Sequence, residues 1–596
     1  MSYQAPVKDM LFCMTELAGL DQVATLPGFE EAGIDTAQAV LDECARFNEG
    51  VLAPLNHEGD KSPSTFHDGE VSTTRGFSDA YRQYAEGGWQ GLQHPLDFGG
   101  QGLPKTIGAA CIEISNSANL SFALCPLLTD GAIEALLTAG SDELKQRYLP
   151  RMVSGEWTGT MNLTEPQAGS DLALVRTRAE AQPDGSYKIF GTKIFITYGE
   201  HDMADNIVHL VLARVAGAPE GVKGISLFVV PKFLVGDDGC LGDRNDVHCV
   251  SIEHKLGIKA SPTAVLQFGD RGGAVGYLVG EENRGLEYMF IMMNAARFAV
   301  GVQGIAVSER ACQLATAYAR ERVQGRPVDG SLPGAAPIIH HPDVKRMLMT
   351  MRALTEGCRA LALVAAAEYD RAHASVDAEQ RKRSQAIYEF LVPLVKGFST
   401  EMSLEVASLG VQVHGGMGFI EETGAAQHLR DAKILSIYEG TTAIQANDLV
   451  GRKTVRDGGA VARALAAQIE TTEGQLRASG SAAAIAMARR LGQGRQAFLA
   501  VVDFVVEQFR VDPNAVFAAS VPYLLLAGNL AAGWQLGRAL LVAERTLASG
   551  EDTDFMRAKI ASARFYAEHI LTRVPGLRDS AIDGAAAVTE LPAEIF

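Results

Sequence analysis

A run of nearly forty residues with apolar side chains at helical spacing most constrains the fold of this chain. The run covers residues 285–323 and reads GLEYMFIMMNAARFAVGVQGIAVSERACQLATAYARERV. Apolar residues at such intervals lie on one face of an amphipathic helix. Two more helical blocks follow, Pro342 to Tyr369 and Arg381 to Leu409. The sequence therefore predicts a helical bundle that begins near Glu282.

The middle of the chain has a different pattern, which is typical of extended segments. The tetrapeptide Pro183-Asp184-Gly185-Ser186 is a turn signal between two such segments. Four strand-like runs follow it, at residues 207–215, 225–230, 264–268 and 274–279. We therefore expect an antiparallel β domain between about residues 160 and 280.

Helical patterns also lie before and after these two regions. Residues 37–47 and 144–153 are helical segments, separated by turns that contain Gly and Pro. Gly, Ala and Ser are frequent between residues 474 and 484, which indicates a linker or a loop between helices. Near the end of the chain one helix face is predicted to carry Met556, Ile560, Ala563, Ala567 and Ile570.

An α+β fold follows from this order of patterns. The 596 residues exceed what one hydrophobic core serves, so about three or four domains are expected. We predict an N-terminal helical domain, a central antiparallel β domain, a C-terminal helical bundle and an additional C-terminal helical domain. The predicted segments are 1–36 (an N-terminal helical segment), 37–158 (the N-terminal α domain), 159–281 (the central β domain), 282–452 (the C-terminal α domain) and 453–596 (the additional helical domain).

The composition is that of a soluble globular protein, and it argues against some partners. A net charge of −18 disfavours nucleic acid, because phosphate binding needs clustered Lys and Arg. The eight cysteines show no C-x-x-C spacing, so reduced thiols in a cytosolic setting are the simpler interpretation. Lys8 and Asp9 interrupt the N-terminus before any apolar run reaches the length of a secretory signal. We therefore expect a cytoplasmic protein.

From its composition, the stretch Ala515 to Trp534 is the only membrane-like one that we expect. It is rich in alanine, and Pro522 and Asn529 interrupt it. These features favour a buried helix over a membrane span. The histidines His340, His341, His414 and His428 are not at metal-binding spacing, so we expect no metal site.

Glu439 is the carboxylate with the most informative surroundings. It stands between Tyr438 and the flexible step Gly440-Thr441, within the mostly apolar segment RDAKILSIYEGTTAIQ. Apolar surroundings destabilise a charged carboxylate and raise its pKa, which makes it a better base near neutral pH. Taken alone, a glutamate that caps a helix or forms a salt bridge is the commoner explanation.

Three more motifs lie upstream of Glu439 in a set order. They are LTEPQAGSD at residues 163–171, KIFITYG at residues 193–199 and QVHGGMGF at residues 412–419. Together with IYEGT they resemble the acyl-CoA dehydrogenase family over roughly residues 40–450. Members are flavoproteins that introduce a double bond between the α and β carbons of an acyl-CoA. The long tail resembles the extended members, including the 3-methylthiopropanoyl-CoA and very-long-chain types.

The resemblance implies which residue is the catalytic base. In the family the base is the glutamate of IYEGT, which is Glu439 here. Some members place the base directly before a helical arginine that matches Arg297, but this chain has Ala296 there, which takes no proton. An acidic residue usual three positions before that arginine is Asn294 here. The resemblance further implies substrate contacts from Ser170, Asn294, Arg297 and Gly440.

The resemblance also implies that FAD is the cofactor. Thr164 and Thr197 offer hydroxyl groups to the edge of the flavin ring, and Phe195 stands where many relatives have a tryptophan. Arg322 matches an arginine that reaches the FAD pyrophosphate of the other subunit. The full set of expected FAD contacts is Leu163, Thr164, Ser170, Phe195, Thr197, Arg322, Gln412, Gly415, Gly416, Thr441 and Gln445.

Family membership would also imply the partners and the pathway. Electrons would pass to an electron-transferring flavoprotein, in fatty-acid β-oxidation or in the oxidation of 3-methylthiopropanoyl-CoA. We expect a homodimer in which the tail covers the surface that a second dimer would use; peripheral membrane contact is the less favoured role for the tail. The alternatives are an acyl-CoA oxidase that uses oxygen, a non-enzymatic DNA-associated relative, and a catalytically silent scaffold.

Overall fold

The computed structural model describes residues 3–595, so the first two residues of the predicted N-terminal segment and Phe596 of the predicted last domain lie outside the described residues. The chain forms two compact units. The sheet unit comprises Arg46–Leu103 and Ala118–Ala299. The helical unit comprises Met1–Ala45, Pro104–Ser117 and Val300–Phe596.

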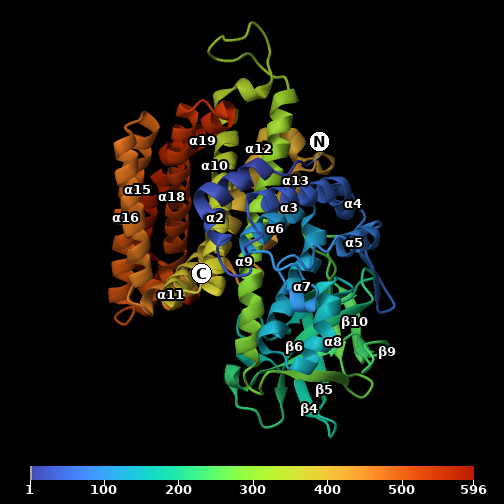
Figure 1. The fold of residues 1–596 in the computed structure, drawn as a ribbon. Helices are drawn as coiled ribbons and strands as arrows, with labels where there is room; N and C mark the ends of the chain where they lie inside the picture. Colours follow the sequence, from blue (N-terminus) through green and yellow to red (C-terminus); the bar gives the residue numbers. More distant parts are fainter. Residues whose placement is uncertain (1–2, 596) are drawn as a thin grey trace. The chain divides into compact units, whose positions relative to one another are not determined.

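An eight-stranded sheet is the centre of the sheet unit (Figure 1). Its strands are hydrogen-bonded in the order β10-β11-β5-β12-β7-β6-β3, and β4 pairs with both β5 and β6. The strands are β3 (Trp157–Asn162), β4 (Arg178–Ala181), β5 (Tyr187–Thr197), β6 (Asn206–Val215), β7 (Ser226–Pro231), β10 (Val247–Ile252), β11 (Thr263–Phe268) and β12 (Ala274–Val279). Two small hairpins add β1 (Thr65–His67) with β2 (Glu70–Ser72) and β8 (Phe233–Val235) with β9 (Leu241–Arg244).

The sheet is not wholly antiparallel, which corrects one detail of the sequence prediction. Strand β6 pairs in parallel with β3 and with β4, whereas the other pairs of the sheet are antiparallel. A parallel pair needs a long connection between its strands. Residues 163–205 supply that connection from β3 to β6, and they include β4 and β5. Alternation of apolar residues predicts a strand, but it does not reveal the strand's partner.

Strand β6 is buried on both faces, which explains its nearly continuous apolar sequence. Val208, Leu210 and Leu212 belong to one hydrophobic core, together with side chains from the helices α7 (Leu120–Ala139) and α8 (Asp142–Val153). Val211 and Ala213 belong to a second core on the opposite side of the sheet. This division follows the two-residue period of a strand. The sheet unit also contains the helices α4 (Ala53–Lys61) and α5 (Phe77–Glu86).

Long helices make up the helical unit. Helix α9 (Gly285–Glu321) begins in the sheet unit and ends here, which confirms the predicted forty-residue helix. The remaining helices are α1 (Val7–Phe12), α2 (Leu20–Val23), α3 (Ile34–Phe47), α6 (Lys105–Ala118), α10 (Pro342–Ala374), α11 (Ala378–Pro393), α12 (Ser399–His414), α13 (Ala425–Leu435), α14 (Thr442–Val450), α15 (Ala460–Ser479), α16 (Ala482–Gln508), α17 (Pro513–Ala518), α18 (Ser520–Ala548), α19 (Thr553–Phe565), α20 (Val574–Ile582) and α21 (Ala585–Thr589).

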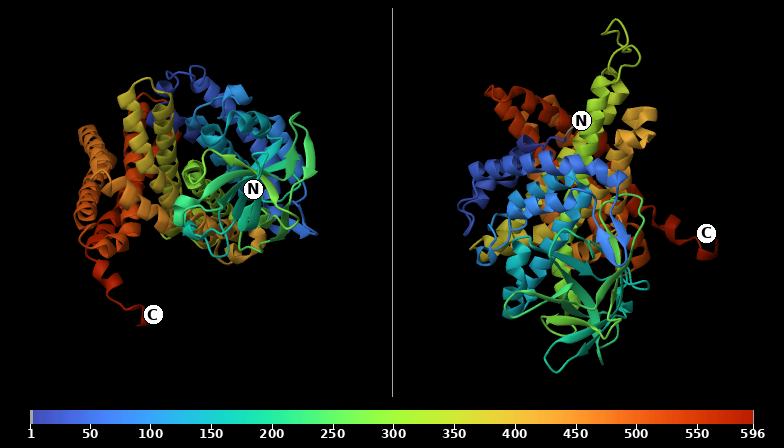
Figure 2. Two further views of the ribbon diagram at one scale, coloured as in Figure 1. Left: turned by 90° about the horizontal axis from the view of Figure 1, so that it is seen from below. Right: turned by 90° about the vertical axis from the view of Figure 1, so that its right-hand side faces the viewer.

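The C-terminal tail folds as a bundle that packs on the rest of the helical unit. Helices α15, α16 and α18 run side by side, and α18 also contacts α10 and α14 (Figures 1 and 2). Gly528 of α18 allows the closest approach, because a Cβ atom there would lie 2.3 Å from the ring of Phe398. A larger side chain at residue 528 would push α18 away from the segment that carries Phe398.

The predicted apolar face of the tail is largely buried. Met556, Ala563, Ala567 and Ile570 are buried, and Ile560 is half-buried. The face runs from α19 into a π-helical turn, η11 (Tyr566–Ile570). Of the linker or inter-helix loop expected between residues 474 and 484, the structure has a short loop at residues 480–481, because α15 ends at Ser479 and α16 begins at Ala482. Gly480, with φ +75°, ends α15, and Ser481 caps the start of α16, so the small residues mark a tight turn between the two helices.

Candidate active site

Glu439 lies in a tight connection between α13 and α14, in the helical unit. Its backbone has φ +55°, and the next residue, Gly440, has φ +90°. The left-handed region suits Gly, whereas a side chain with a Cβ atom costs about 1–2 kcal/mol there. Thr441 then caps α14, since its hydroxyl accepts a hydrogen bond from the N–H of Ile444. The half-buried Glu439 side chain therefore projects from a strained turn that a helix start holds in place.

Hydrogen bonds hold the backbone on both sides of the Glu439–Gly440 peptide. The ammonium group of Lys396 donates to the carbonyl oxygen of Gly440 at 2.6 Å. The side-chain amide of Gln445 donates to the carbonyl oxygen of Glu439 at 3.3 Å. Lys396 is fully buried, and it is not among the site residues expected from the sequence motifs. A lysine within the apolar run LVPLVKGF was the signal that could have drawn attention to it.

Tyr438 links the loop that carries Glu439 to two helices. Its hydroxyl donates to the side-chain oxygen of Gln303 on α9, and the amide of Gln303 donates to Asn116 on α6 at 2.9 Å. Burial raises the pKa of the Tyr438 hydroxyl well above its usual range, and the nearby charge of Glu439 acts in the same direction. The hydroxyl therefore stays protonated and serves as a permanent donor.

In the sheet unit, the expected flavin contacts meet where β3 ends beside β5. The N–H of Ile194 donates to the carbonyl oxygen of Thr164 at 2.9 Å, which places Thr164 next to Phe195. Phe195 has φ +59° at a β-bulge in the pairing of β5 with β11. A bulge redirects a side chain out of the sheet, and 58% of the Phe195 residue surface is exposed. An apolar ring is thus presented at the surface, and Thr164 and Thr197 are both partly exposed.

A buried ion pair supports this end of β3. Lys193 on β5 lies 2.8 Å from the carboxylate of Glu165, and it also donates to the carbonyl oxygen of Leu163 at 3.1 Å. Burial alone would raise the pKa of Glu165, but Lys193 and the hydrogen bonds from Thr177 and Arg176 bring it down to about 2. Burial lowers the pKa of Lys193 to about 8, against the attraction of Glu165. Both residues lie within the quoted motifs, yet their pairing was not foreseen.

The segment after α12 has the open shape that a phosphate group requires. Gly415 has φ +61°, and a Cβ atom at Gly415 or Gly416 would meet nothing within 4 Å. Gln412 is exposed beside them, as is Phe419. Backbone without side chains permits close approach to a phosphate. Ser170 of the sheet unit is likewise exposed, directly after Gly169, where a Cβ atom would also meet nothing.

The residues present fit FAD on three observations. The exposed ring of Phe195 offers an apolar surface for a flavin ring. The open backbone at Gly415 and Gly416 offers room for phosphates. The side-chain oxygen of Gln445 is buried without a hydrogen-bond partner among the described residues, so it is an acceptor that awaits a donor such as an adenine amino group. Arg322, just beyond the end of α9, is exposed.

Arg297 and Asn294 lie in the sheet unit, one helical turn apart on α9. Arg297 is buried, and its guanidinium group approaches the side-chain oxygen of Asn294 at 3.5 Å, the weak limit of a hydrogen bond. Ala296 is buried and carries no ionisable group. The structure thus divides the predicted residues between the two units: Glu439, Gly440, Thr441, Gln445, Gln412, Gly415, Gly416 and Arg322 belong to the helical unit, and the others belong to the sheet unit.

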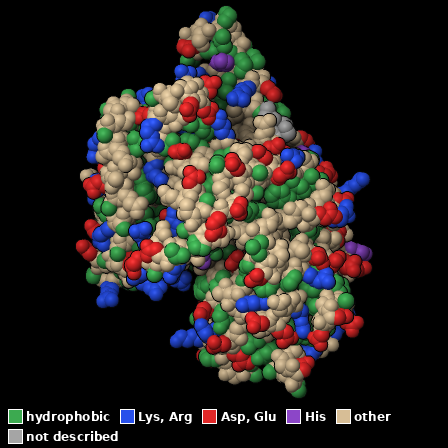
Figure 3. Space-filling view, in the orientation of Figure 1, with side chains coloured by type: hydrophobic (Ala, Val, Ile, Leu, Met, Phe, Trp, Pro, Cys, Tyr) green, Lys and Arg blue, Asp and Glu red, His purple; other side chains and the backbone are tan. Residues whose placement is uncertain are grey.

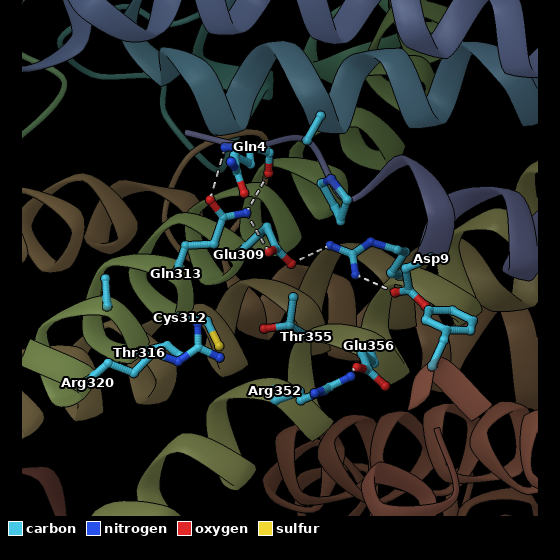
Figure 4. A pocket seen from close by; sticks show the side chains of 15 residues that line it. Gln4, Asp9, Glu309, Cys312, Gln313, Thr316, Arg320, Arg352, Thr355 and Glu356 are labelled. Carbon is cyan, nitrogen blue, oxygen red and sulfur yellow. Dashed lines mark hydrogen bonds and ion pairs between the residues drawn. The ribbon is translucent and has the colours of Figure 1, made fainter. Parts of the chain in front are cut away.

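A cavity of about 550 Å³ in the helical unit contains none of the predicted site residues (Figure 4). Its wall carries a network of buried charges. Arg359 lies 2.7 Å from Asp9, 2.5 Å from Glu113 and 2.7 Å from Glu309. Lys559 of α19 pairs with Asp9 and with Glu356. Since these charges are paired with one another, the network has the character of a structural junction between α1, α6, α9, α10 and α19.

Two described helices are long and apolar enough to cross a membrane, by length and composition alone. They are α7 and α9, and most of each is buried within the protein, as in the core of a soluble protein. The stretch Ala515 to Trp534 forms α17 and part of α18 and is not among them, so the expectation that it is the only membrane-like stretch is wrong. Within residues 3–595, no group of three or more His, Cys, Asp or Glu side chains could hold a metal ion.

Nearly the whole chain matches domain families of one enzyme class. The matches are "Acyl-CoA dehydrogenase, N-terminal domain" at residues 35–156, the "middle domain" at 160–271, the "C-terminal domain" at 283–453 and "Acetyl-CoA dehydrogenase C-terminal like" at 464–592. The chain belongs to the acyl-CoA dehydrogenase family. It is therefore a flavoprotein oxidoreductase with FAD as the cofactor, as the sequence motifs predicted. The five predicted segment boundaries stay a prediction.

Several relatives of this acyl-CoA dehydrogenase match over almost their full length. The 3-methylmercaptopropionyl-CoA dehydrogenase of Ruegeria pomeroyi is 57% identical over 96% of both chains. A broad-specificity linear acyl-CoA dehydrogenase of Mycobacterium tuberculosis is 37% identical over 97% of both chains. A butyryl-CoA dehydrogenase of Syntrophomonas wolfei is 33% identical over 100% of this chain and 99% of its own.

Solved structures of the family share the fold. An acyl-CoA dehydrogenase of Bacillus anthracis complexed with FAD superposes with a TM-score of 0.74 at 22% identity, over 94% of this chain and 90% of its own. The Caenorhabditis elegans protein ACDH-11 superposes with a TM-score of 0.75 at 20% identity, over 98% of this chain and 96% of its own. These similarities extend through the additional C-terminal helices, so the predicted α+β architecture is confirmed.

Proposed function

We propose that this acyl-CoA dehydrogenase oxidises the CoA thioester of 3-(methylthio)propanoate, with Glu439 as the base. The observation that supports the base most strongly is the geometry of Glu439, a half-buried carboxylate on a left-handed turn between Tyr438 and Gly440. The 57% identity to a 3-methylmercaptopropionyl-CoA dehydrogenase over 96% of both chains supports the substrate.

The reaction removes a proton and a hydride from neighbouring carbons of the acyl chain. The carboxylate of Glu439 takes the proton from the α carbon as the α–β double bond forms. FAD, when bound, supplies the acceptor for the hydride that leaves the β carbon, because no side chain accepts a hydride. The product is the trans-2-enoyl thioester, and the proton remains on Glu439 until it is released to solvent.

Other residues of the chain would hold the reactants. Thr164 and Thr197 would donate hydrogen bonds to the edge of the flavin, and Phe195 would cover part of its face. Gly415 and Gly416 would line the phosphates, while Thr441 and Gln445 would contact the adenine side. Ser170, Asn294, Arg297 and Gly440 would contact the substrate, and Arg322 would reach the FAD of a second subunit. Leu163 and Gln412 complete this proposed set.

Electron transfer to an electron-transferring flavoprotein, a homodimeric state and a cytoplasmic location belong to the same proposal. They rest on family membership and on the soluble character of the fold. An acyl-CoA oxidase would instead consume oxygen with acyl-CoA alone. Oxygen uptake at a rate equal to that of dye reduction would contradict the proposed electron acceptor.

The role of Glu439 is tested by mixing enzyme and acyl-CoA under anaerobic conditions and following the flavin absorbance. Glu439→Gln is nearly isosteric but does not act as a base, so reduction should slow by about 10²- to 10⁴-fold or more, with bound FAD retained. Glu422→Gln, at an exposed position on the same unit, is the matched control and should behave as wild type. Reduction of Glu439→Gln at the wild-type rate would show that another base exists.

The substrate is tested by a pair of thioesters that differ in one atom. Pentanoyl-CoA has a methylene group where 3-methylthiopropanoyl-CoA has sulfur, so the two acyl chains have nearly the same length. We expect a higher kcat/KM for the methylthio compound, measured with an artificial electron acceptor. A preference for pentanoyl-CoA or for longer chains would make this enzyme a fatty-acid dehydrogenase.

A further inference from the structure

Lys396 is completely buried, and it lies beside the loop that carries Glu439. It lies on a π-helical turn, η7 (Leu394–Phe398), between α11 and α12. All five residues of this turn are buried. π-turns widen a helix locally, and they occur frequently at functional sites. The turn aims the Lys396 ammonium group at the carbonyl oxygen of Gly440, 2.6 Å away.

A buried ammonium group is costly, because its charge loses hydration and needs strong hydrogen-bond acceptors in return. A methionine or leucine would fill the same space without that cost. The acceptor that Lys396 bonds is the carbonyl of the residue directly after Glu439. A charged donor makes this a stronger bond than an amide would make.

The bond acts on the part of the backbone that needs support. Glu439 and Gly440 both have positive φ angles, +55° and +90°. Gly440 is conformationally free, since it has no Cβ atom, and an unrestrained glycine next to Glu439 would let the carboxylate swing. The bond from Gln445 to the Glu439 carbonyl is longer, at 3.3 Å, and comes from a neutral amide. Of these hydrogen bonds to the two carbonyls, the one from Lys396 is the shortest and has a charged donor.

We infer that Lys396 is a positioning residue for Glu439. By fixing the Gly440 carbonyl, it orients the turn so that the Glu439 carboxylate faces the substrate α carbon. Lys396 itself contacts neither substrate nor cofactor in this role. The inference rests on the proposed role of Glu439 as the base.

The first test is Lys396→Met in the FAD-loaded enzyme, measured by anaerobic flavin reduction. The rate of reduction should fall by about 10- to 100-fold, the loss that a small misplacement of a catalytic group causes. KM and FAD content should stay within about 2-fold of wild type. The isotope effect of α-deuterated substrate should rise, because proton removal becomes slower. Lys433→Met, at an exposed lysine of α13, is the matched control and should change none of these.

An unchanged rate in Lys396→Met would overturn the inference. A loss of rate that only parallels a loss of FAD would do the same, since it would indicate a structural role. Lys396→Gln provides a second variant that keeps a neutral donor, and it should lose less rate than Lys396→Met. If both fail to bind FAD while Glu439→Gln binds it, Lys396 serves folding rather than orientation.

The decisive experiment is a double-mutant cycle. If Lys396 acts through Glu439, then Lys396→Met should cost less than about 2-fold in the residual rate of a Glu439→Gln enzyme. A full additional loss in that background would overturn the inference. Wild-type flavin reduction by Glu439→Gln alone would instead overturn the proposed base, so the two failures are distinguishable.

Discussion

Lys559 and Asp9 form a buried ion pair between α19, near the C-terminus, and α1, near the N-terminus. Their exposed fractions are 2% and 8%. Burial would raise the pKa of Asp9, but Lys559 and Arg359 outweigh that effect and lower it to about 2. Buried charges therefore join α1 and α19 within the helical unit.

Removing one partner of this pair should destabilise the helical unit. Lys559→Met leaves the carboxylates of Asp9 and Glu356 buried with one cation fewer, which typically costs about 3–5 kcal/mol. We expect a lower midpoint in thermal or urea unfolding, with the flavin reduction rate per bound FAD unchanged. Arg557→Met, at an exposed position of the same helix, is the control. Equal midpoints for the two variants would mean that Lys559 contributes no net stability.

The Glu165–Lys193 pair should be required for FAD retention. Lys193→Met removes the donor to the Leu163 carbonyl and leaves Glu165 buried without its cation, so the end of β3 should lose its fixed position. We expect a lower FAD-to-protein ratio after gel filtration and partial recovery with added FAD. Lys188→Met, five residues earlier on β5, removes only a 3.3 Å bond to Gly273 and should retain FAD. Full FAD occupancy in Lys193→Met would contradict this expectation.

Stability should depend on pH through His94. Its ring lies 2.9 Å from Asp130 and 3.6 Å from Glu134. Burial would lower the pKa of His94, but hydrogen bonds and charge attraction from these carboxylates raise it to about 9. A raised folded-state pKa stabilises the protein fully below the ordinary value near 6.5, and this stability disappears as the pH rises through about 9.

His94→Gln should therefore lower the unfolding midpoint most at pH 6 and least at pH 9.5. A shift of this size corresponds to roughly 3 kcal/mol at most. His67→Gln, at an exposed histidine, should show no such trend. A difference between wild type and His94→Gln that stays constant from pH 6 to pH 9.5 would exclude a charged His94 in the folded state.

The protein should be a homodimer in solution. The tail helices pack on α10 and α14 of their own chain, and we expect this packing to occupy the surface that a second dimer would use. Light scattering should give about twice the chain mass of 63.5 kDa. A stable tetramer would show that the tail leaves that surface free. Sedimentation with anionic liposomes at low salt tests the less favoured membrane role, and we expect the protein to stay in the supernatant.

Sequence patterns predicted the elements better than their partners. Apolar spacing located α9 and the buried face of α19, because that spacing reflects which side of a helix meets a core. It did not predict that Lys559 would be buried beside that face, since Asp9 and Glu356 are distant in the chain. The parallel pairing of β3 with β6 was missed for the same reason, because a strand's own sequence does not name its neighbour.

The candidate site shows the same division. The motifs identified Glu439 and Phe195 as candidate site residues. They did not predict the left-handed turn at Glu439 or the β-bulge at Phe195. Lys193 lies in the motif KIFITYG, and Lys396 lies in the apolar run LVPLVKGF. A lone lysine in such a segment is easily taken for a surface residue. Their importance depends on burial and on a specific acceptor, and both are properties of the folded chain.

The left-handed backbone of Glu439 implies a trade-off between stability and activity. Glycine would adopt φ +55° without strain, so Glu439→Gly should unfold at a higher temperature than Glu439→Ala, and Glu439→Asn should fall between them. A descendant of this chain that no longer needed to remove protons would gain stability by exchanging its base for glycine. In such a sequence the altered motif IYGGT would indicate that the dehydrogenase activity is lost while the surrounding fold is retained.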